Sequence, residues 1–289
     1  MEDIMGAGRK FCIIGTPVDH SKSPGPYRKI FDEHGYPDHT YVINEIKTRE
    51  EFDSFISDMR NGMWDGCNVT MPWKTAAAQA MDVLLDNAFL TDSVNTVVNR
   101  GGVLYGDSTD GGGMCDAIIS DTGMVLEGKK AVMLGCGGAA RSIIAELALR
   151  HAGQITILGR PGNNMDLTRR VIDKIHEKSS RQSAQSGQSH KETVIEFCVD
   201  TDGYFPAEKI TEADILINCT PLGMAPDTGK LPIPEDIRLS ETLIVADAVY
   251  NPDETLLIRK AKACGCRTVK GIRMLELQAE RASELYLDQ

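Results

Sequence analysis

The sequence predicts an α/β protein of two domains: an N-terminal α/β domain with a mainly parallel sheet, and a Rossmann-type dinucleotide-binding domain. The first observation is that apolar, strand-like runs alternate with amphipathic helical segments through nearly all of the 289 residues. This alternation is typical of sheets built from parallel strands and crossover helices. The second observation is a glycine-rich segment, 134–141, that follows an apolar run and opens a helical pattern. Strand, glycine turn and helix in this order are typical of dinucleotide-binding sites.

The first half of the chain shows the order strand, helix, strand, helix. The expected segments are strand 10–15, helix 24–34, strand 41–46 and helix 50–61. Apolar side chains of the last segment recur at helical spacing and share one face: Phe52, Phe55, Ile56 and Met59. An apolar run before Asn68 predicts a further strand, and Lys74 is expected to open the helix after Pro72.

The second half repeats this alternation. The expected elements are strands 131–134, 154–158, 194–199, 214–218 and 243–246, helices 139–151 and 167–178, and a final helix that begins near Gly271. The Ser- and Gln-rich stretch 179–190 lacks large apolar residues, so we expect a mobile surface loop that carries no chemistry.

A cluster of glycines separates the two halves. Segment 109–113 ends in three successive glycines, and such a run suits a hinge or a close approach of two backbones. We therefore place the domain boundary here, between residues 110 and 111.

Length and composition favour a soluble enzyme. The formal net charge is −11 and there is no run of lysine or arginine, so nucleic acid and anionic membrane surfaces are disfavoured as partners. No stretch approaches the roughly 20 apolar residues that span a bilayer, and a cytoplasmic location is expected. The eight cysteines lack the spacing of zinc ligands, so no metal is expected. Cys264 and Cys266 could form a redox pair, although a turn at a helix end explains them more simply.

Two segments have the features of a substrate site. Lys74 stands where a strand end meets a helix start, which is where open α/β sheets bind ligands, and its amine could act as a general base. Ser21 and Ser23 follow the first strand, and their two hydroxyls could bind a carboxylate. Ser23 before Pro24 would also fit a plain helix N-cap.

Three further polar residues are ambiguous when taken one at a time. Asn95 could bind a diol or simply form a turn. Tyr250 follows the last long strand of the second half, and Gln278 lies two turns into the final helix.

The glycine segment predicts where a dinucleotide would bind. Gly135 allows the turn, and Gly137 lets the backbone approach a pyrophosphate at the helix N-terminus. A glycine turn that serves packing alone is the alternative. The next strand leads into Arg160, where NAD-selective sites usually have an acid. A guanidinium suits a 2′-phosphate, which favours NADP over NAD, and a solvated surface arginine is the other explanation.

Together these segments resemble the shikimate dehydrogenase family, including its quinate/shikimate dehydrogenase branch. The matching motifs extend through almost the whole chain: 20–24, 68–74, 95–96, 109–110, 135–139, 218–224, 247–252 and 271–278. The resemblance implies that 1–110 form a substrate domain, which the C-terminal helix, 272–289, completes, and that 111–271 form the dinucleotide-binding domain. It also places the active site in the cleft between the two domains. It also implies a cytoplasmic enzyme of aromatic amino-acid (chorismate) biosynthesis, which interconverts 3-dehydroshikimate and shikimate with NADP. NAD and quinate are the alternatives for cofactor and substrate, and a homodimer is the assembly that the resemblance allows.

The resemblance also implies roles for individual residues. Lys74 and Asp110 would form the catalytic pair, and Ser21 and Ser23 would hold the substrate carboxylate with help from Tyr250. The residues implied for the ring hydroxyls are Thr70, Asn95 and Gln278. The positions implied for cofactor binding are Gly135, Cys136, Gly137, Gly138, Ala139, Arg160, Thr220, Ala248 and Gly271.

Several positions depart from the family pattern. The unusual residues are Tyr27 and Arg28 in place of histidine and asparagine, Asp92 and Ser93 in place of glycine and alanine, and Ser108 in place of asparagine. They leave two hypotheses: a working dehydrogenase, or a slow paralogue that binds a nucleotide and acts on another ligand or as a sensor. Retention of both Lys74 and Asp110 favours the enzyme, while a salt bridge that merely ties two loops is the alternative for this pair.

Overall fold

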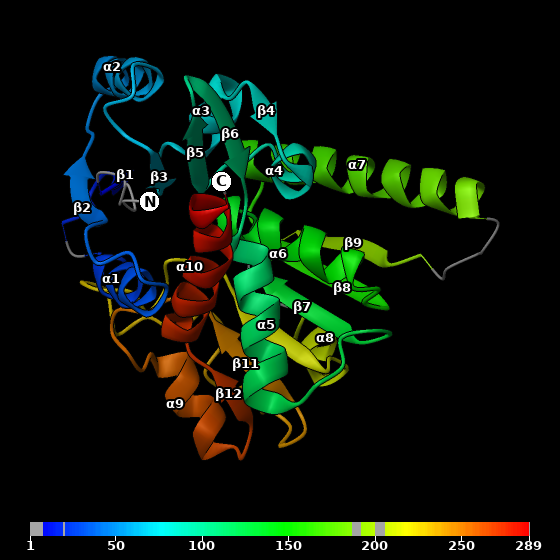
Figure 1. Ribbon diagram of the computed structural model, residues 1–289. Helices are drawn as coiled ribbons and strands as arrows, with labels where there is room; N and C mark the ends of the chain where they lie inside the picture. Colours follow the sequence, from blue (N-terminus) through cyan, green and yellow to red (C-terminus); the bar gives the residue numbers. More distant parts are fainter. Residues whose placement is uncertain (1–7, 20, 187–191, 200–205, 289) are drawn as a thin grey trace. The chain divides into compact units, whose positions relative to one another are not determined.

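The computed structural model describes residues 8–19, 21–186, 192–199 and 206–288, and the chain divides into two compact units (Figure 1). Unit 1 consists of Met1–Thr109 and Ala279–Gln289, and unit 2 consists of Asp110–Gln278. The chain therefore enters unit 2 at the first residue of a helix and returns to unit 1 within its last helix.

Unit 1 contains a mixed sheet with the strand order β2-β1-β3-β5-β6-β4. Its strands are β1 (Lys10–Gly15), β2 (Thr40–Glu45), β3 (Gly66–Val69), β4 (Val83–Leu84), β5 (Thr96–Arg100) and β6 (Val103–Asp107). Strand β1 pairs in parallel with β2 and β3, and β4 pairs in parallel with β6. Strand β5 runs antiparallel to both of its neighbours. The predicted mainly parallel sheet is confirmed.

The helices of unit 1 bury one face each against this sheet. They are α1 (Pro24–Glu33), α2 (Arg49–Arg60), α3 (Lys74–Ala80), α4 (Asp86–Thr91) and the last turns of α10 (Gly271–Leu287). Helix α2 begins with a capping box formed by Thr48 and Glu51. Its buried residues are the four predicted from helical spacing: Phe52, Phe55, Ile56 and Met59.

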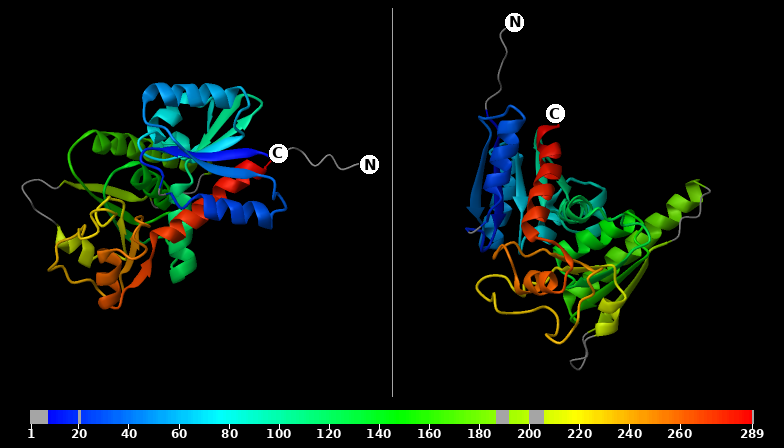
Figure 2. Two further views of the ribbon diagram at one scale, coloured as in Figure 1. Left: turned by 90° about the vertical axis from the view of Figure 1, so that its left-hand side faces the viewer. Right: turned by 90° about the horizontal axis from the view of Figure 1, so that it is seen from below.

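The C-terminal turns of α10 complete the core of unit 1. Ala279, Ala282 and Tyr286 are fully buried in one apolar cluster with Phe11 and Tyr27. The last part of this helix lies beside α1 in both views of Figure 2. A segment from the far end of the chain is therefore part of the N-terminal unit.

Unit 2 contains an all-parallel sheet with the strand order β12-β11-β10-β7-β8-β9. Its strands are β7 (Lys130–Leu134), β8 (Gln154–Gly159), β9 (Val194–Val199), β10 (Ile215–Asn218), β11 (Ile244–Asp247) and β12 (Arg267–Val269). Numbered from the first strand of the unit, this is the order 3-2-1-4-5-6 of the Rossmann fold. The predicted dinucleotide-binding architecture is confirmed.

Helices cover both faces of this second sheet. They are α5 (Asp110–Thr122), α6 (Gly138–Leu149), α7 (Asn163–Ser186), α8 (Ala207–Thr211) and α9 (Leu256–Ala263). Alternate residues of β7 point to opposite faces: Met133 packs with α5, α6 and α7, whereas Val132 packs with α8 and α9. Burial on both faces explains the continuous apolar runs of these strands.

The glycine cluster after Asp110 forms the first turn of α5 and lies buried. A Cβ on Gly111 would overlap the carbonyl oxygen of Ser142 in α6, and one on Gly113 would lie 2.7 Å from the backbone nitrogen of Gln278 in α10. Close backbone approach, one of the two predicted roles of this cluster, is confirmed.

One predicted loop is wrong over most of its length. Helix α7 continues to Ser186, so 179–186 are helical, and 187–190 lie outside the described residues. The stretch is polar but rich in residues that are compatible with a helix, so the absence of large apolar side chains did not exclude a helix here. In contrast, Cys264 caps α9 and Gly265 has a φ of +81°, so the predicted turn at a helix end is confirmed. Within the described residues, no helix is long and apolar enough to cross a membrane.

Candidate active site

The strand order of unit 2 reverses between β7 and β10, and ligands of such sheets bind outside the carboxyl ends of the strands at this point. The glycine loop follows β7 here. Gly135 has a φ of +100° and its amide donates to the carbonyl of Leu158 at 2.8 Å. A Cβ on Gly135 would lie 3.1 Å from Cγ2 of Thr220, so the turn needs glycine for both its conformation and its packing.

The second glycine of the predicted cofactor loop, Gly137, faces open space. Gly137 is the N-cap of α6, and a Cβ there would meet none of the described atoms within 4 Å. The backbone amides of Gly138 and Ala139 begin the helix, where the helix dipole favours an anion. The loop therefore offers the open, amide-lined approach that a pyrophosphate requires.

Two arginines place positive charge near this loop. Burial raises the pKa of the Cys136 thiol, and the charges of Arg141 and Arg160 act in the opposite direction. Arg160 is exposed just after β8, while Arg141 is buried in the first turn of α6. No role was predicted for Arg141, although the sequence already places it in the first turn of the predicted helix 139–151. Both charges favour an anionic ligand.

The other residues expected to bind the cofactor gather at the same edge of the sheet. Asn218 ends β10 and its Oδ1 accepts hydrogen bonds from the amide and hydroxyl of Thr220 at 3.0 and 2.7 Å. The amide of Ala248, after β11, donates to the carbonyl of Asn218 at 2.8 Å. A Cβ on Gly271 would lie 2.8 Å from the carbonyl oxygen of Ala248. The structure thus brings Thr220, Ala248 and Gly271 together.

Two predicted substrate ligands also belong to unit 2. Tyr250 is half-buried three residues after the end of β11. Gln278 is buried in α10, where its Nε2 donates to the carbonyl of Leu275 at 3.0 Å. Their roles as ligands of the substrate stay predictions.

In unit 1, the two serines predicted to bind a carboxylate are hydrogen-bonded to each other. The hydroxyl of Ser21 donates to Oγ of Ser23 at 3.1 Å, and the amide of Ser23 donates to Oγ of Ser21 at 3.2 Å. Ser23 precedes α1, but its side chain makes no capping hydrogen bond. Its Oγ instead accepts the hydrogen bond from the hydroxyl of Ser21. Helix capping therefore does not account for this side chain.

Lys74 is the first residue of α3, as the sequence predicted. The preceding Trp73 fixes the start of this helix, because its indole Nε1 donates to the carbonyl of Ile46 at 2.8 Å and its ring stacks on Phe52. Thr70 lies at the end of β3, where its amide donates to the carbonyl of Ile14 at 2.8 Å. Thr70 and Lys74 are thus held on a rigid strand-to-helix connection.

Asn95 belongs to a buried polar chain at the carboxyl edge of the sheet of unit 1. Its Oδ1 accepts from the amide of Thr109 at 2.8 Å, and its Nδ2 donates to the hydroxyl of Thr109 at 3.1 Å. Asn68 is the next residue of this hydrogen-bonded series, because its Nδ2 donates to the carbonyl of Asn95 and to Oγ1 of Thr96. Its Oδ1 accepts from the hydroxyl of Tyr286 at 3.0 Å. These contacts fix the orientation of the Asn95 side-chain amide, which a residue that only forms a turn would not require.

The predicted catalytic pair is split between the two units. Lys74 lies in unit 1, and Asp110, which is 8% exposed, is the first residue of α5 in unit 2. Their pairing stays a prediction.

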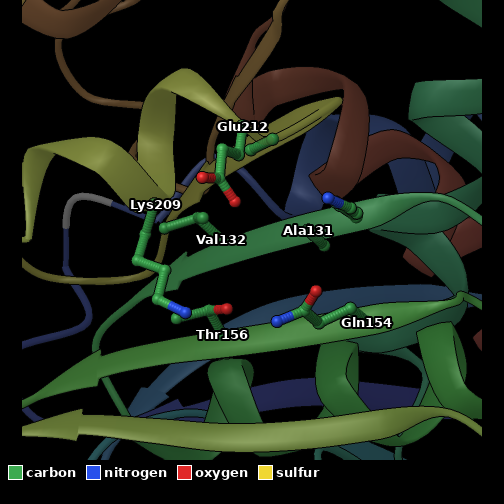
Figure 3. Close-up of a pocket in the computed structure, with 8 residues that line it drawn as sticks. Ala131, Val132, Gln154, Thr156, Lys209 and Glu212 are labelled. Atoms are coloured by element: carbon green, nitrogen blue, oxygen red, sulfur yellow. The ribbon is translucent and has the colours of Figure 1, made fainter.

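A small pocket elsewhere in unit 2 is unrelated to these residues. It is lined by Ala131, Gln154, Thr156, Lys209 and Glu212 (Figure 3). Gln154 opens β8, so the pocket lies toward the amino ends of the strands, away from the glycine loop. Beside it, Nζ of Lys209 lies 2.6 Å from Oε1 of Glu196, a pair that packs α8 against the sheet.

Known proteins are similar to this chain in both of its units. The family model of the shikimate dehydrogenase substrate binding domain matches residues 13–97. Shikimate dehydrogenase (NADP(+)) from Streptococcus pneumoniae is 34% identical over 281 residues, which cover 97% of this chain and 92% of that protein.

Solved structures give the same result. Shikimate 5-dehydrogenase from Listeria monocytogenes, in complex with shikimate and NAD, is 31% identical with a TM-score of 0.84, over 100% of this chain and 95% of that one. The enzyme from Thermus thermophilus, in complex with NADP(H) and shikimate, is 25% identical with a TM-score of 0.78, over 97% of this chain and 94% of that one. The glycine loop, the serine pair and the segment before Lys74 thus occur in a chain that belongs to the shikimate dehydrogenase family.

Proposed function

We propose that this protein is an NADP-dependent shikimate dehydrogenase, which interconverts 3-dehydroshikimate and shikimate in the pathway to chorismate. One observation carries the proposal: the 34% identity to an enzyme of that name extends over 97% of the chain, and so spans both units. We also propose 1–110 with 272–289 as the substrate domain and 111–271 as the NADP domain, and a cytoplasmic location.

The reaction requires a hydride and a proton to leave the same alcohol group. When bound, NADP supplies the hydride acceptor at its nicotinamide. The hydroxyl proton passes to a base, and we assign this role to Lys74, whose neutral amine accepts the proton during oxidation and whose ammonium returns it during reduction. Asp110 is assigned to orient the lysine amine and to hold the reacting hydroxyl.

The remaining residues bind and orient the substrate. Ser21 and Ser23 carry hydroxyl donors for its carboxylate, and Tyr250 contributes a third. The ring hydroxyls are assigned to Thr70, Asn95 and Gln278. Hydroxyl and amide groups suit this task, because they bind polar groups without adding charge beside the reacting centre.

Arg160 supports NADP as the preferred cofactor. It is exposed immediately after β8 and its charge reaches the glycine loop. A guanidinium can form a charge-assisted contact with a 2′-phosphate, which NAD lacks.

Steady-state assays test the proposal. The purified protein is expected to reduce NADP with shikimate, with a higher kcat/KM than with quinate and a higher kcat/KM for NADP than for NAD. A protein that binds NADPH but turns over neither acid would be the slow paralogue instead. Faster turnover of quinate would assign it to the quinate/shikimate branch.

A further inference from the structure

The side chain of Asp247 is fully buried at the carboxyl end of β11. Its Oδ1 accepts from Nδ2 of Asn218 at 2.9 Å and from the amide of Val249 at 3.0 Å. Its Oδ2 accepts from the hydroxyl of Thr255 at 2.6 Å. A buried carboxylate is tolerated only when it is hydrogen-bonded in this way.

Asn218, at the end of the neighbouring strand β10, connects Asp247 to the loop that follows β10. Its side chain is also fully buried and links two loops: Nδ2 donates to Asp247, and Oδ1 accepts both hydrogen bonds from Thr220. Because an amide has a donor end and an acceptor end, Asp247 fixes which way the Asn218 amide faces. With the amide reversed, an N–H group would face the amide of Thr220.

The loops held by this pair carry residues of the proposed cofactor site. Thr220 lies against Gly135 of the glycine loop, and the loop after β11 leads through Ala248 to Tyr250. A Cβ on Gly271 would lie 2.5 Å from the carbonyl oxygen of Val249. Two loops that should touch the dinucleotide are therefore hydrogen-bonded to one buried carboxylate and its amide partner, and the glycine loop and Gly271 pack against these loops.

We propose that Asp247, acting through Asn218, is a positioning residue that holds the loops after β10 and β11 in the arrangement that binds NADP and places Tyr250. This inference rests on the proposed function. Asp247 touches neither NADP nor substrate in this role. It acts only by orienting the groups that do.

The two oxygens of Asp247 have different requirements. Two N–H groups point at Oδ1, so this position must be an acceptor. The hydroxyl of Thr255 faces Oδ2, and a hydroxyl can accept as well as donate. Burial raises the pKa of the Asp247 carboxyl, while the hydrogen bonds from Thr255, Val249 and Asn218 lower it.

The first experiment compares Asp247→Leu with Asp247→Asn, using Asp236→Asn, an exposed acid of unit 2, as the matched control. Leucine has a similar size but accepts no hydrogen bond, so we expect the Michaelis constants for NADP and shikimate each to rise about tenfold or more. Asparagine keeps an acceptor at the Oδ1 position and should raise them much less. A folded Asp247→Leu protein with wild-type Michaelis constants would overturn the inference.

The second experiment uses Asn218→Asp and does not depend on whether Asp247→Leu folds. The new carboxyl faces Oδ1 of Asp247, so one shared proton can replace the lost N–H bond at low pH. As the pH rises this proton leaves, and two adjacent carboxylates repel each other. We expect the ratio of the variant's dissociation constant for NADPH to that of wild type to rise about tenfold from pH 6 to pH 9. A ratio that stays constant with pH contradicts a positioning role.

The readouts separate this inference from the proposed function. NADPH binding is followed by fluorescence and needs no turnover. A wild-type protein that binds NADPH without oxidising shikimate would refute the function and leave the pH test intact. Normal turnover by wild type, with no change in any Asp247 or Asn218 variant, would refute the inference alone.

Discussion

Lys74 is held at the start of α3 by the anchored ring of Trp73, so its backbone position does not depend on its own side chain. Lys74→Ala should therefore leave the fold intact and remove the proposed base, which typically supplies about 10²–10⁴-fold of the rate. We expect kcat to fall by this factor with a small change in the Michaelis constant for shikimate. Lys29→Ala, which removes an exposed lysine of unit 1 paired with Glu33, is the control. An unchanged kcat would exclude Lys74 from the chemistry.

The serine pair can be separated from a capping role because the side chain of Ser23 makes no cap hydrogen bond. Ser21→Ala and Ser23→Ala should each raise the Michaelis constant for shikimate by an amount equal to about 1–3 kcal/mol. The unfolding midpoint should stay close to that of wild type. Ser54→Ala, at an exposed position of α2, controls for loss of a serine hydroxyl. A lower midpoint with normal shikimate kinetics would return both serines to a structural role.

Arg160 offers a test of cofactor selectivity. Arg160→Ala should reduce kcat/KM for NADP by about 1.5–3 kcal/mol and leave the value for NAD nearly unchanged, because only NADP carries the 2′-phosphate. The wild-type preference should also weaken as salt is raised, since an exposed charge is screened. Arg238→Ala, another exposed arginine of unit 2, is the control. Equal losses with both cofactors would leave Arg160 as a surface residue.

At the scale of elements, α5 depends on glycine for its contact with α6. A Cβ on Gly111 would overlap the carbonyl oxygen of Ser142, and backbone cannot move aside as a flexible side chain can. Gly111→Ala gains about 1 kcal/mol in helix propensity, but overpacking should outweigh it and give a net destabilisation of about 1–3 kcal/mol. Urea unfolding measures this, with the exposed Ser120→Ala of the same helix as control. A more stable Gly111→Ala protein would show that α5 and α6 can separate without loss.

Most elements could be predicted because their periodicity is local. Strands β1 and β9 and the buried face of α2 follow directly from apolar spacing. Helix α9 and strand β12 are short and were not predicted, since eight and three residues hold too few repeats to show a period. The error at 179–186 has the opposite origin: a polar helix shows no apolar stripe.

The positions of Gly135 in a turn and of Lys74 at the start of a helix could be predicted, because each follows from the local sequence; their roles stay predictions. The link between Asp247 and Asn218 could not be predicted, because it depends on β10 and β11 being neighbours in register, with Asn218 opposite Asp247. Sequence alone places both at strand ends but does not give the pairing. Contacts of this kind between strands that are distant in sequence require the fold itself.

At the scale of the whole molecule, unit 1 is built from two distant parts of the chain. Tyr286 is fully buried against Phe11, with ring centroids 4.6 Å apart, and its hydroxyl donates to Oδ1 of Asn68. The core of unit 1 is therefore complete only when residues 279–288 are packed into it. Unit 2 is continuous and retains its whole sheet without them.

Removing 279–289 should therefore damage the two units unequally. Loss of Tyr286 alone is of the class that costs about 3–5 kcal/mol, which is comparable with the whole stability of a domain at about 5–15 kcal/mol. We expect the truncated protein, and to a lesser degree Tyr286→Ala, to lose shikimate turnover while NADPH binding by unit 2 persists. Glu284→Ala, an exposed position of the same helix, should behave as wild type. If truncation abolished NADPH binding and shikimate turnover together, the two units would have to fold as one cooperative body, because the sheet and glycine loop of unit 2 contain none of the deleted residues.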